Sequence, residues 1–318
     1  MILPIFLPNA GCKHKCIFCD QFTMTGEKMP DLKKIEALLK SNNNVSEVAF
    51  YGGTFTGLPF RLQEKFFQTV KDFFPDALLR ISTRPDEISE EIVRILKNYK
   101  VNVVELGIQS MYDDVLSASG RGHTVEDNIR AIKQLLESNI QVSAHLMIGL
   151  PEDSFYKSYM SMLLLIKNGV KIFRIHPTLV FKNTELEKMF IDGNYEPLSL
   201  EEALYTTSEM FLLSVSEKVK IIRLGYYVPE SQKKSIIAGP YHPSFGDMVK
   251  ADAIKKIITR LNIKNVFFEK RYESWFNSYG NKQLPLKSRK IISRGIFFEN
   301  LSFEEAAKLA LEKGVEKI

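Results

Sequence analysis

The feature that most constrains the fold is an alternation of short apolar runs with longer amphipathic stretches. Runs that predict strands lie at residues 2–8, 45–51, 78–83, 101–109, 142–148, 170–176 and 219–223. Stretches that predict helices lie between them, at residues 32–39, 61–74, 89–98, 125–137, 155–168 and 200–215. Strands that alternate with helices form right-handed βαβ units and a parallel sheet. We therefore predict an α/β fold, with a partial (β/α)6-type TIM barrel over residues 1–224.

The alternation ends after residue 224, where turn-forming residues become frequent. The segments Gly225-Tyr-Tyr-Val-Pro and Gly239-Pro-Tyr-His-Pro are typical of turns. Beyond them we predict a helix at residues 248–261 and a strand at 266–269. A last helix is predicted at residues 302–312, with Ser302 as N-cap and Glu305 three residues later. Residues 225–318 are expected to form a C-terminal α/β extension packed on the barrel.

The net charge and the hydropathy of the chain limit the classes of protein to which it can belong. The chain has 318 residues and a formal net charge of +5, a mildly basic balance that permits an anionic substrate without requiring one. No run of about 18 apolar residues is present, so no membrane association is expected. The apolar start lacks a basic leader and a small-residue cleavage site, and we interpret it as a strand rather than a signal peptide.

The three cysteines of the chain lie close together in one loop. Cys12, Cys16 and Cys19 have the spacing C-x3-C-x2-C and directly follow the first predicted strand. An odd, clustered set is a poor disulfide framework, and a reducing cytoplasm with a metal role fits better. Three thiolates are one ligand short of the usual four of a 4Fe–4S cluster, which leaves one iron open to another ligand. The alternative is a zinc site with His14 as the fourth ligand.

Small and polar residues follow the later strands, at the face where barrels carry their active sites. Gly52, Gly53 and Thr54 follow the second strand, where glycine lets backbone approach a ligand closely. The third and fourth strands supply further polar side chains for this face: Ser82, Thr83, Glu105, Gln109 and Ser110. Arg121 precedes a helix, and its two readings, a carboxylate ligand and a helix-capping loop, stay equally open.

The cysteine loop, with Phe18 immediately before the third cysteine, resembles the signature of the radical S-adenosylmethionine superfamily. The resemblance implies a 4Fe–4S cluster on the three cysteines and S-adenosylmethionine as cofactors. It also implies an electron donor such as flavodoxin or ferredoxin. The cofactor-binding residues it implies are Phe18, Gly52, Gly53, Thr54, Ser82, Thr83, Glu105, Gln109, Ser110, Ile148 and Gly149. Thr54 stands where glutamate is commoner in the superfamily, and the adenine motif around Ile148 matches loosely.

Five segments together resemble one branch, the group related to the elongator catalytic subunit. They are Tyr51-Gly-Gly-Thr-Phe-Thr, Ser82-Thr-Arg-Pro-Asp, Glu105-Leu-Gly-Ile-Gln-Ser, Arg121-Gly-His and Gly239-Pro-Tyr-His-Pro-Ser-Phe-Gly. That subunit carries an acetyltransferase domain, and residues 247–318 are too few for one by ordinary domain sizes. Stand-alone members of this branch resemble small-molecule or nucleoside enzymes.

The resemblance implies hydrogen abstraction from a nucleobase or nucleoside by a 5′-deoxyadenosyl radical, with fragmentation of a C–N or C–C bond. The most specific hypothesis is a lyase of queuine or queuosine in base salvage. A tRNA-modifying enzyme is the less favoured alternative. A zinc-stabilised RNA-binding module, with the basic run at residues 282–294 on phosphate, is the alternative of another class. His145, Arg174 and Asp247 are the candidate catalytic residues; for His145 a core histidine is the competing interpretation.

Overall fold

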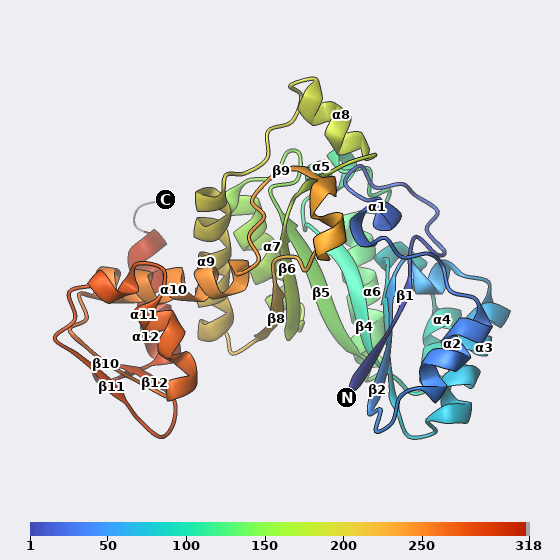
Figure 1. Cartoon of the computed structure of the whole chain (residues 1–318), viewed down its shortest axis with the longest axis horizontal. Helices are drawn as coiled ribbons and strands as arrows, with labels where there is room; N and C mark the ends of the chain where they lie inside the picture. Colours follow the sequence, from blue (N-terminus) through green and yellow to red (C-terminus); the bar gives the residue numbers. More distant parts are fainter. Residues whose placement is uncertain (316–318) are drawn as a thin grey trace.

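A seven-stranded parallel sheet forms the centre of the protein in the computed structural model, which describes residues 1–315. The strands follow one another in the order β1-β2-β3-β4-β5-β6-β8, and the sheet curls into a half-barrel (Figure 1). Their bounds are β1 (Ile2–Leu7), β2 (Glu47–Gly52), β3 (Leu78–Thr83), β4 (Val101–Gln109), β5 (Gln141–Ile148), β6 (Ile172–Pro177) and β8 (Lys220–Leu224). The predicted partial barrel is confirmed, and its sheet contains one strand for each of the seven predicted apolar runs.

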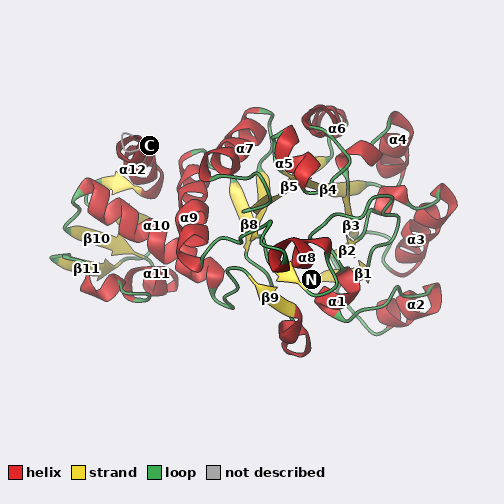
Figure 2. Ribbon diagram, turned by 90° about the horizontal axis from the view of Figure 1, so that it is seen from above, coloured by secondary structure: helices red, strands yellow, loops and turns green. Residues whose placement is uncertain are grey.

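Amphipathic helices cover the outer face of the sheet (Figure 2). They are α2 (Leu32–Lys40), α3 (Phe60–Phe73), α4 (Glu90–Asn98), α6 (Val125–Glu137), α7 (Phe155–Lys167) and α9 (Leu200–Ser216). Most of them begin after an N-cap residue whose side chain accepts a hydrogen bond from a backbone N–H of the first turn, as Ser89 does for α4 and Thr124 for α6. Apolar side chains between these helices and the sheet form the main core, including Phe50, Phe67 and Phe173.

Shorter elements lie over the carboxyl ends of the strands. They are α1 (Gln21–Thr25), α5 (Asp113–Ala118), α8 (Glu185–Ile191) and the antiparallel pair β7 (Val180–Phe181) with β9 (Ile236–Ala238). Five 3₁₀ helices complete the connections: η1 (Phe55–Gly57), η2 (Pro85–Glu87), η3 (Glu230–Ser235), η4 (Lys270–Tyr272) and η5 (Asn281–Gln283). Helix α8 touches the cysteine loop, because Leu186 N donates to Ile17 O at 2.9 Å.

The C-terminal part contains a second, four-stranded sheet in the order β11-β10-β12-β13. Its elements are α10 (Phe245–Leu261), β10 (Asn265–Phe268), α11 (Glu273–Asn277), β11 (Ser288–Ile291), β12 (Ile296–Phe298), β13 (Leu301–Ser302) and α12 (Phe303–Val315). Helices α10 and α12 pack against α9, so this part lies beside the half-barrel (Figure 1). The predicted capping box is present: Ser302 N donates to Glu305 Oε2 at 2.8 Å, and Glu305 N donates to Ser302 Oγ.

None of the helices within residues 1–315 is both long enough and apolar enough to cross a bilayer.

Candidate functional site

The cysteine loop leaves β1 at the carboxyl ends of the parallel strands, as predicted. Cys12 is exposed, while Cys16 and Cys19 are half-buried. Burial, followed by the neighbouring Cys16 and Cys12 thiolates, raises the pKa of the Cys19 thiol above its ordinary value. Phe18 between them is buried against Met147 and other apolar side chains. The loop therefore carries its three thiols at the carboxyl ends of the strands, with the buried Phe18 ring anchoring it to the core.

The Gly52-Gly53 pair is required by close backbone packing. A Cβ at Gly53 would lie 2.1 Å from Ala10 O and 2.4 Å from Ala10 N, distances that no side chain can occupy. Gly52 has φ +110°, and its carbonyl accepts a hydrogen bond from Gln21 Nε2 at 2.7 Å. These contacts hold the cysteine loop directly on the end of β2. The role of both glycines in binding a cofactor stays a prediction.

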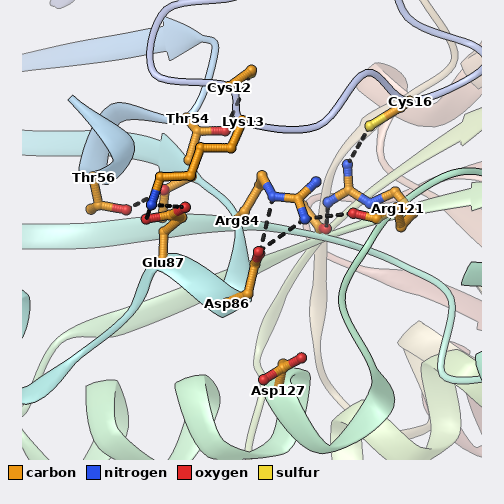
Figure 3. A network of polar contacts seen from close by, with 12 residues as sticks. Cys12, Lys13, Cys16, Thr54, Thr56, Arg84, Asp86, Glu87, Arg121 and Asp127 are labelled. Atoms are coloured by element: carbon orange, nitrogen blue, oxygen red, sulfur yellow. Dashed lines mark hydrogen bonds and ion pairs between the residues drawn. The ribbon is translucent and has the colours of Figure 1, made fainter.

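Two polar side chains reach the cysteine sulfurs (Figure 3). Thr54 Oγ1 lies 3.3 Å from Cys12 Sγ, and Arg121 Nη1 donates to Cys16 Sγ at 3.1 Å. Arg121 is buried, and its backbone carbonyl accepts from Arg84 Nη2. Asp86 in turn holds Arg84 through two bonds of 3.0 Å. A guanidinium beside a thiolate stabilises its negative charge. Arg121 also lies in the loop that leads to the capping box of α6 at Thr124, as one of its two interpretations expected, while binding of a carboxylate by Arg121 stays a prediction.

The donor set fits a cluster better than a zinc ion. Within residues 1–315, no three His, Cys, Asp or Glu side chains lie close enough together to hold a single metal ion, and this includes the three cysteines themselves. His14, the fourth ligand of the zinc alternative, is exposed, and its ring packs beside Gly122. Three thiols on one loop, with an N–H donor aimed at one sulfur, suit an iron–sulfur cluster, whose sulfurs accept such bonds.

A buried ion network spans the inner face of the half-barrel. Glu105 Oε1 lies 3.1 Å from both Arg80 Nη1 and Arg174 Nη2. Arg174 also donates to Tyr51 Oη at 3.2 Å and stacks over the Tyr51 ring at 4.9 Å. Burial raises the pKa of Glu105, while Arg174 and Arg80 oppose that shift. Glu105 is thus bound to two arginines, and its predicted contact with the cofactor stays a prediction.

A pair of histidines lies beyond this network. His145 Nε2 and His176 Nδ1 are 2.8 Å apart, and the His176 ring lies against Tyr226 with centroids separated by 4.4 Å. Burial, then the Arg174 charge, lowers the pKa of His145 to about 3, and His176 is shifted in the same direction. Both imidazoles are therefore neutral at physiological pH. His176 Nε2 is buried without a hydrogen-bond partner among the described residues.

The remaining strand-end candidates are divided between the inner face and the surrounding packing. Gln109 ends β4 in the left-handed region, at φ +67°, and its Oε1 is buried without a partner in the described part of the chain. Ser110 is directed toward α7, with its Oγ 3.5 Å from Ser161 Oγ. Thr83 Oγ1 lies 2.6 Å from Thr56 Oγ1, and Ser82 is half-buried beside it. Their cofactor contacts stay predictions.

The fifth strand and helix α10 supply the last candidates. The Ile148 carbonyl accepts from the Thr178 amide and hydroxyl, at 2.9 and 2.8 Å. Gly149 has φ +73°, and its amide donates to Asp153 at 2.8 Å. Asp247 is exposed in the first turn of α10, 3.6 Å from Lys250. The structure therefore places Asp247 in an ion pair on the surface, while its catalytic role stays untested.

Sequence reasoning missed several residues of the inner face: Tyr51, Arg80, His176, Arg223 and Tyr226. A signal for Tyr51, Arg80 and His176 exists in the alternation of side chains along each strand, whereas Arg223 follows a shift in register that breaks this alternation on β8. Residues two apart point to one face, so Glu105 on β4 and His145 on β5 identify the inward register of their neighbours. Tyr226 lies beyond the end of β8, where no such periodicity applies.

Two family models match the chain. The model described as the radical SAM superfamily matches residues 6–156, and the radical SAM C-terminal domain matches residues 170–255. An uncharacterised protein of Methanocaldococcus jannaschii is 31% identical, over 71% of this chain and 76% of its own length. The tRNA uridine(34) acetyltransferase of Methanocaldococcus infernus is 28% identical over 78% of this chain, but this match spans only 55% of the relative.

A solved structure shows the same arrangement. The archaeal Elp3 of Methanocaldococcus infernus, with an N-terminal deletion, superposes with a TM-score of 0.65 and 25% identity, covering 80% of this chain and 62% of that one. This chain therefore spans little more than half the length of its acetyltransferase relatives. It belongs to the radical SAM superfamily, whose enzymes use a 4Fe–4S cluster and S-adenosylmethionine, and within it to the Elp3-like branch.

Proposed function

We propose that this chain is a radical enzyme that abstracts hydrogen from a nucleobase- or nucleoside-type substrate and fragments a C–N or C–C bond. When bound, the reduced cluster and S-adenosylmethionine supply the 5′-deoxyadenosyl radical, with the electron coming from a donor such as flavodoxin or ferredoxin. Cys12, Cys16 and Cys19 would hold the cluster in a reducing compartment such as the cytoplasm.

The observation that carries the proposal is the polar inner face beside the cysteine loop. The His145–His176 pair offers neutral imidazoles, which exchange hydrogen bonds with a heterocycle without adding charge. Tyr226 adds an aromatic surface next to His176. His176 is buried, and His145 and Tyr226 are half-buried, so water has limited access to these groups, which helps protect a reactive substrate radical. Flat, hydrogen-bonding bases match such a surface, and queuine or queuosine is the specific substrate we propose, with a lyase outcome.

A tRNA substrate is the second candidate, favoured by one observation. Relatives that are 28% identical carry the name tRNA uridine(34) acetyltransferase, and their matched regions include the radical SAM part of this chain. A base within tRNA would use the same inner face, but it would also need phosphate contacts outside the barrel. Salt-sensitive tRNA binding that is required for 5′-deoxyadenosine formation would favour this candidate over a free base.

The test begins with the metal site. After anaerobic reconstitution, Cys16→Ala should lose both the cluster absorbance and 5′-deoxyadenosine formation. His14→Ala, in the same loop, is the matched control and should retain both, because the cluster does not use His14. Loss of metal in His14→Ala, with stoichiometric zinc in the wild type, would instead support the zinc-bound RNA-binding module.

The substrate is then sought by adding queuine, queuosine, other nucleosides and tRNA to the reconstituted enzyme. We expect queuine or queuosine to raise 5′-deoxyadenosine formation above the substrate-free rate and to yield a simpler deazaguanine, measured by mass spectrometry. Stimulation by tRNA alone would contradict the free-base proposal.

A further inference from the structure

The wall of the inner face formed by β6 and β8 carries more positive charge than the neighbouring carboxylates on β2 and β4 neutralise. Arg174 and Arg223 are register partners on these neighbouring parallel strands, directly after a shift in register at Phe173, and the Arg223 side chain is exposed where Arg174 is half-buried. Glu105 neutralises one charge but is shared between Arg174 and Arg80. Glu47 pairs with Arg80 from its other side. Within residues 1–315, Arg223 makes no ion pair and no side-chain hydrogen bond, so this group of five side chains has one cation in excess.

Unused hydrogen-bonding atoms lie at the same place. Arg174 Nε and His176 Nε2 are both buried without a partner in the described residues, and the His176 side chain is more than nine-tenths buried. His176 Nδ1 is already bound to His145, so Nε2 is the ring nitrogen left for a ligand. Arg174 and His176 are two residues apart on β6 and therefore share one face of that strand, and Arg223 is the register partner of Arg174 on the next strand.

Two guanidinium groups on adjacent strands repel each other unless an anion lies near them. Neighbouring strands in a sheet are about 4.8 Å apart, so the two side chains leave the backbone close together; Arg174 is half-buried and Arg223 is exposed, so solvent weakens the repulsion between their charges. Burial, then the Arg174 charge, lowers the pKa of Arg223 from its ordinary value. An oxyanion between them would accept paired N–H bonds from each guanidinium and would offset this repulsion.

We propose that Arg174, Arg223 and His176 form a binding site for an oxyanionic group of the substrate, either a phosphate monoester or a carboxylate. The proposal rests on the proposed function, since the anion would be one end of the nucleobase- or nucleoside-type substrate. Arg223 is the residue that determines this specificity, because Arg174 is already held by Glu105 and Tyr51. The cysteine loop follows β1 at the other edge of the sheet, and Arg174 reaches across the interior to Tyr51 of β2, so the proposed site faces the same interior as the loop while using none of its cysteines.

Binding to the reconstituted enzyme tests the proposal directly. Equilibrium dialysis would compare GMP with guanosine, and orotate with uracil, each pair differing in one oxyanion. We expect at least one anionic member to bind roughly 10-fold more tightly than its neutral partner, with an advantage that falls as salt rises. Preference for GMP identifies a phosphate site, and preference for orotate identifies a carboxylate site.

Substitution of the arginine gives the second measurement. Arg223→Gln should remove the roughly 10-fold preference while leaving guanosine, uracil and S-adenosylmethionine affinities unchanged, and Arg223→Lys should keep part of it. Arg94→Gln, at an exposed position on the outer helix α4, is the matched control and should bind like the wild type. Circular dichroism confirms that each variant is folded.

Two outcomes would overturn the site. One is equal binding of anionic and neutral partners by the wild type; the other is an Arg223→Gln variant that loses S-adenosylmethionine affinity instead. Failure of the proposed function is separate. If anion binding depends on Arg223 but no base, nucleoside or nucleotide stimulates 5′-deoxyadenosine formation, the anion site stands and the nucleoside substrate is wrong.

Discussion

The two sides of the half-barrel position their functional groups by different means. On the β1–β2 side, backbone contacts hold the cysteine loop. Thr54 N donates to Ala10 O at 2.7 Å, and the backbone of Gly53 packs so closely against Ala10 that no side chain would fit between them. On the β5–β8 side, buried side chains hold one another, as in the His145–His176 pair at 2.8 Å. The first side is built from main chain, whereas the second depends on ionisable side chains.

This difference determines how each side responds to change. Backbone packing is insensitive to pH and salt but cannot accept extra atoms. Ionisable side chains in a buried wall tolerate small changes in shape, yet their free energy depends on every neighbouring charge. Substitutions on the β1–β2 side should therefore act through sterics, and those on the β5–β8 side through protonation and charge.

The largest effect is expected from Gly53→Ala. Its new Cβ would overlap Ala10 O and N, so the cysteine loop must move away from β2. We expect a loss of about 3 kcal/mol in the free energy of unfolding, because the overlap is with backbone that cannot rotate away. Iron bound after anaerobic reconstitution should fall with it. Urea denaturation and iron analysis measure the two quantities.

Gly193→Ala is the control for this substitution. Gly193 has a positive φ of +72°, which Gly53 does not, but a Cβ there would meet nothing within 4 Å. It should cost only about 1 kcal/mol, from the left-handed backbone alone, and it should leave iron binding unchanged. If both variants lose stability equally, close packing of the cysteine loop is not what Gly53 provides.

The fold was largely predictable because its signals are local and periodic. The seven strands of the half-barrel lie where apolar runs alternate with amphipathic helices, and the capping box at Ser302 appears as predicted. The short pair β7 and β9 was missed, since two strands of two and three residues carry no periodicity. Their pairing joins segments more than 50 residues apart, which only tertiary packing specifies. The boundary placed at residue 224 stays a prediction.

The site was predictable where its residues follow one another in sequence. The cysteine loop and Gly52-Gly53 are contiguous motifs, and the structure brings them into contact. The contact of Arg121 with Cys16 joins residues 105 apart, and the Arg174–Tyr51 contact joins residues 123 apart. Such pairs depend on strand register and barrel curvature, which a single sequence does not display. Asp247 shows that proximity in sequence is not sufficient. It directly follows the segment at residues 239–246, yet its side chain lies on the surface in an ion pair with Lys250.

The next largest effect is expected from Arg121. Its charged side chain contacts the cysteine loop, which is otherwise held mainly by backbone contacts. Its N–H bond to Cys16 Sγ would stabilise the added electron of a reduced cluster. We expect Arg121→Gln to lower the reduction potential of the reconstituted cluster by on the order of 60 mV, the equivalent of one charge-assisted hydrogen bond for a one-electron couple. An EPR-monitored redox titration measures the shift.

Arg130→Gln tests whether any lost cation has the same effect. Arg130 is exposed on α6 and pairs with Asp127, away from the sulfurs. Its potential should match that of the wild type. A shift of similar size in both variants would assign the effect to net charge and remove the special role of the Arg121–Cys16 contact.

The smallest expected effect isolates the ionisable character of the β5–β8 side. His145 has a folded-state pKa of about 3, below its ordinary value of 6.5. Above pH 6.5 its ionisation does not alter stability. As the pH falls below 6.5, His145 takes up a proton in the unfolded chain but not in the folded chain, so the wild type loses stability.

His145→Asn cannot titrate there. Its free energy of unfolding should therefore fall by about 1 kcal/mol less than that of the wild type between pH 7 and 5, a value reduced for the partial exposure of the ring. Urea denaturation at both pH values, with NMR of the folded imidazole, measures this difference. Parallel losses in both proteins, or a ring that titrates near pH 6 in the folded state, would show that the wall is no more sensitive to charge than the cysteine loop.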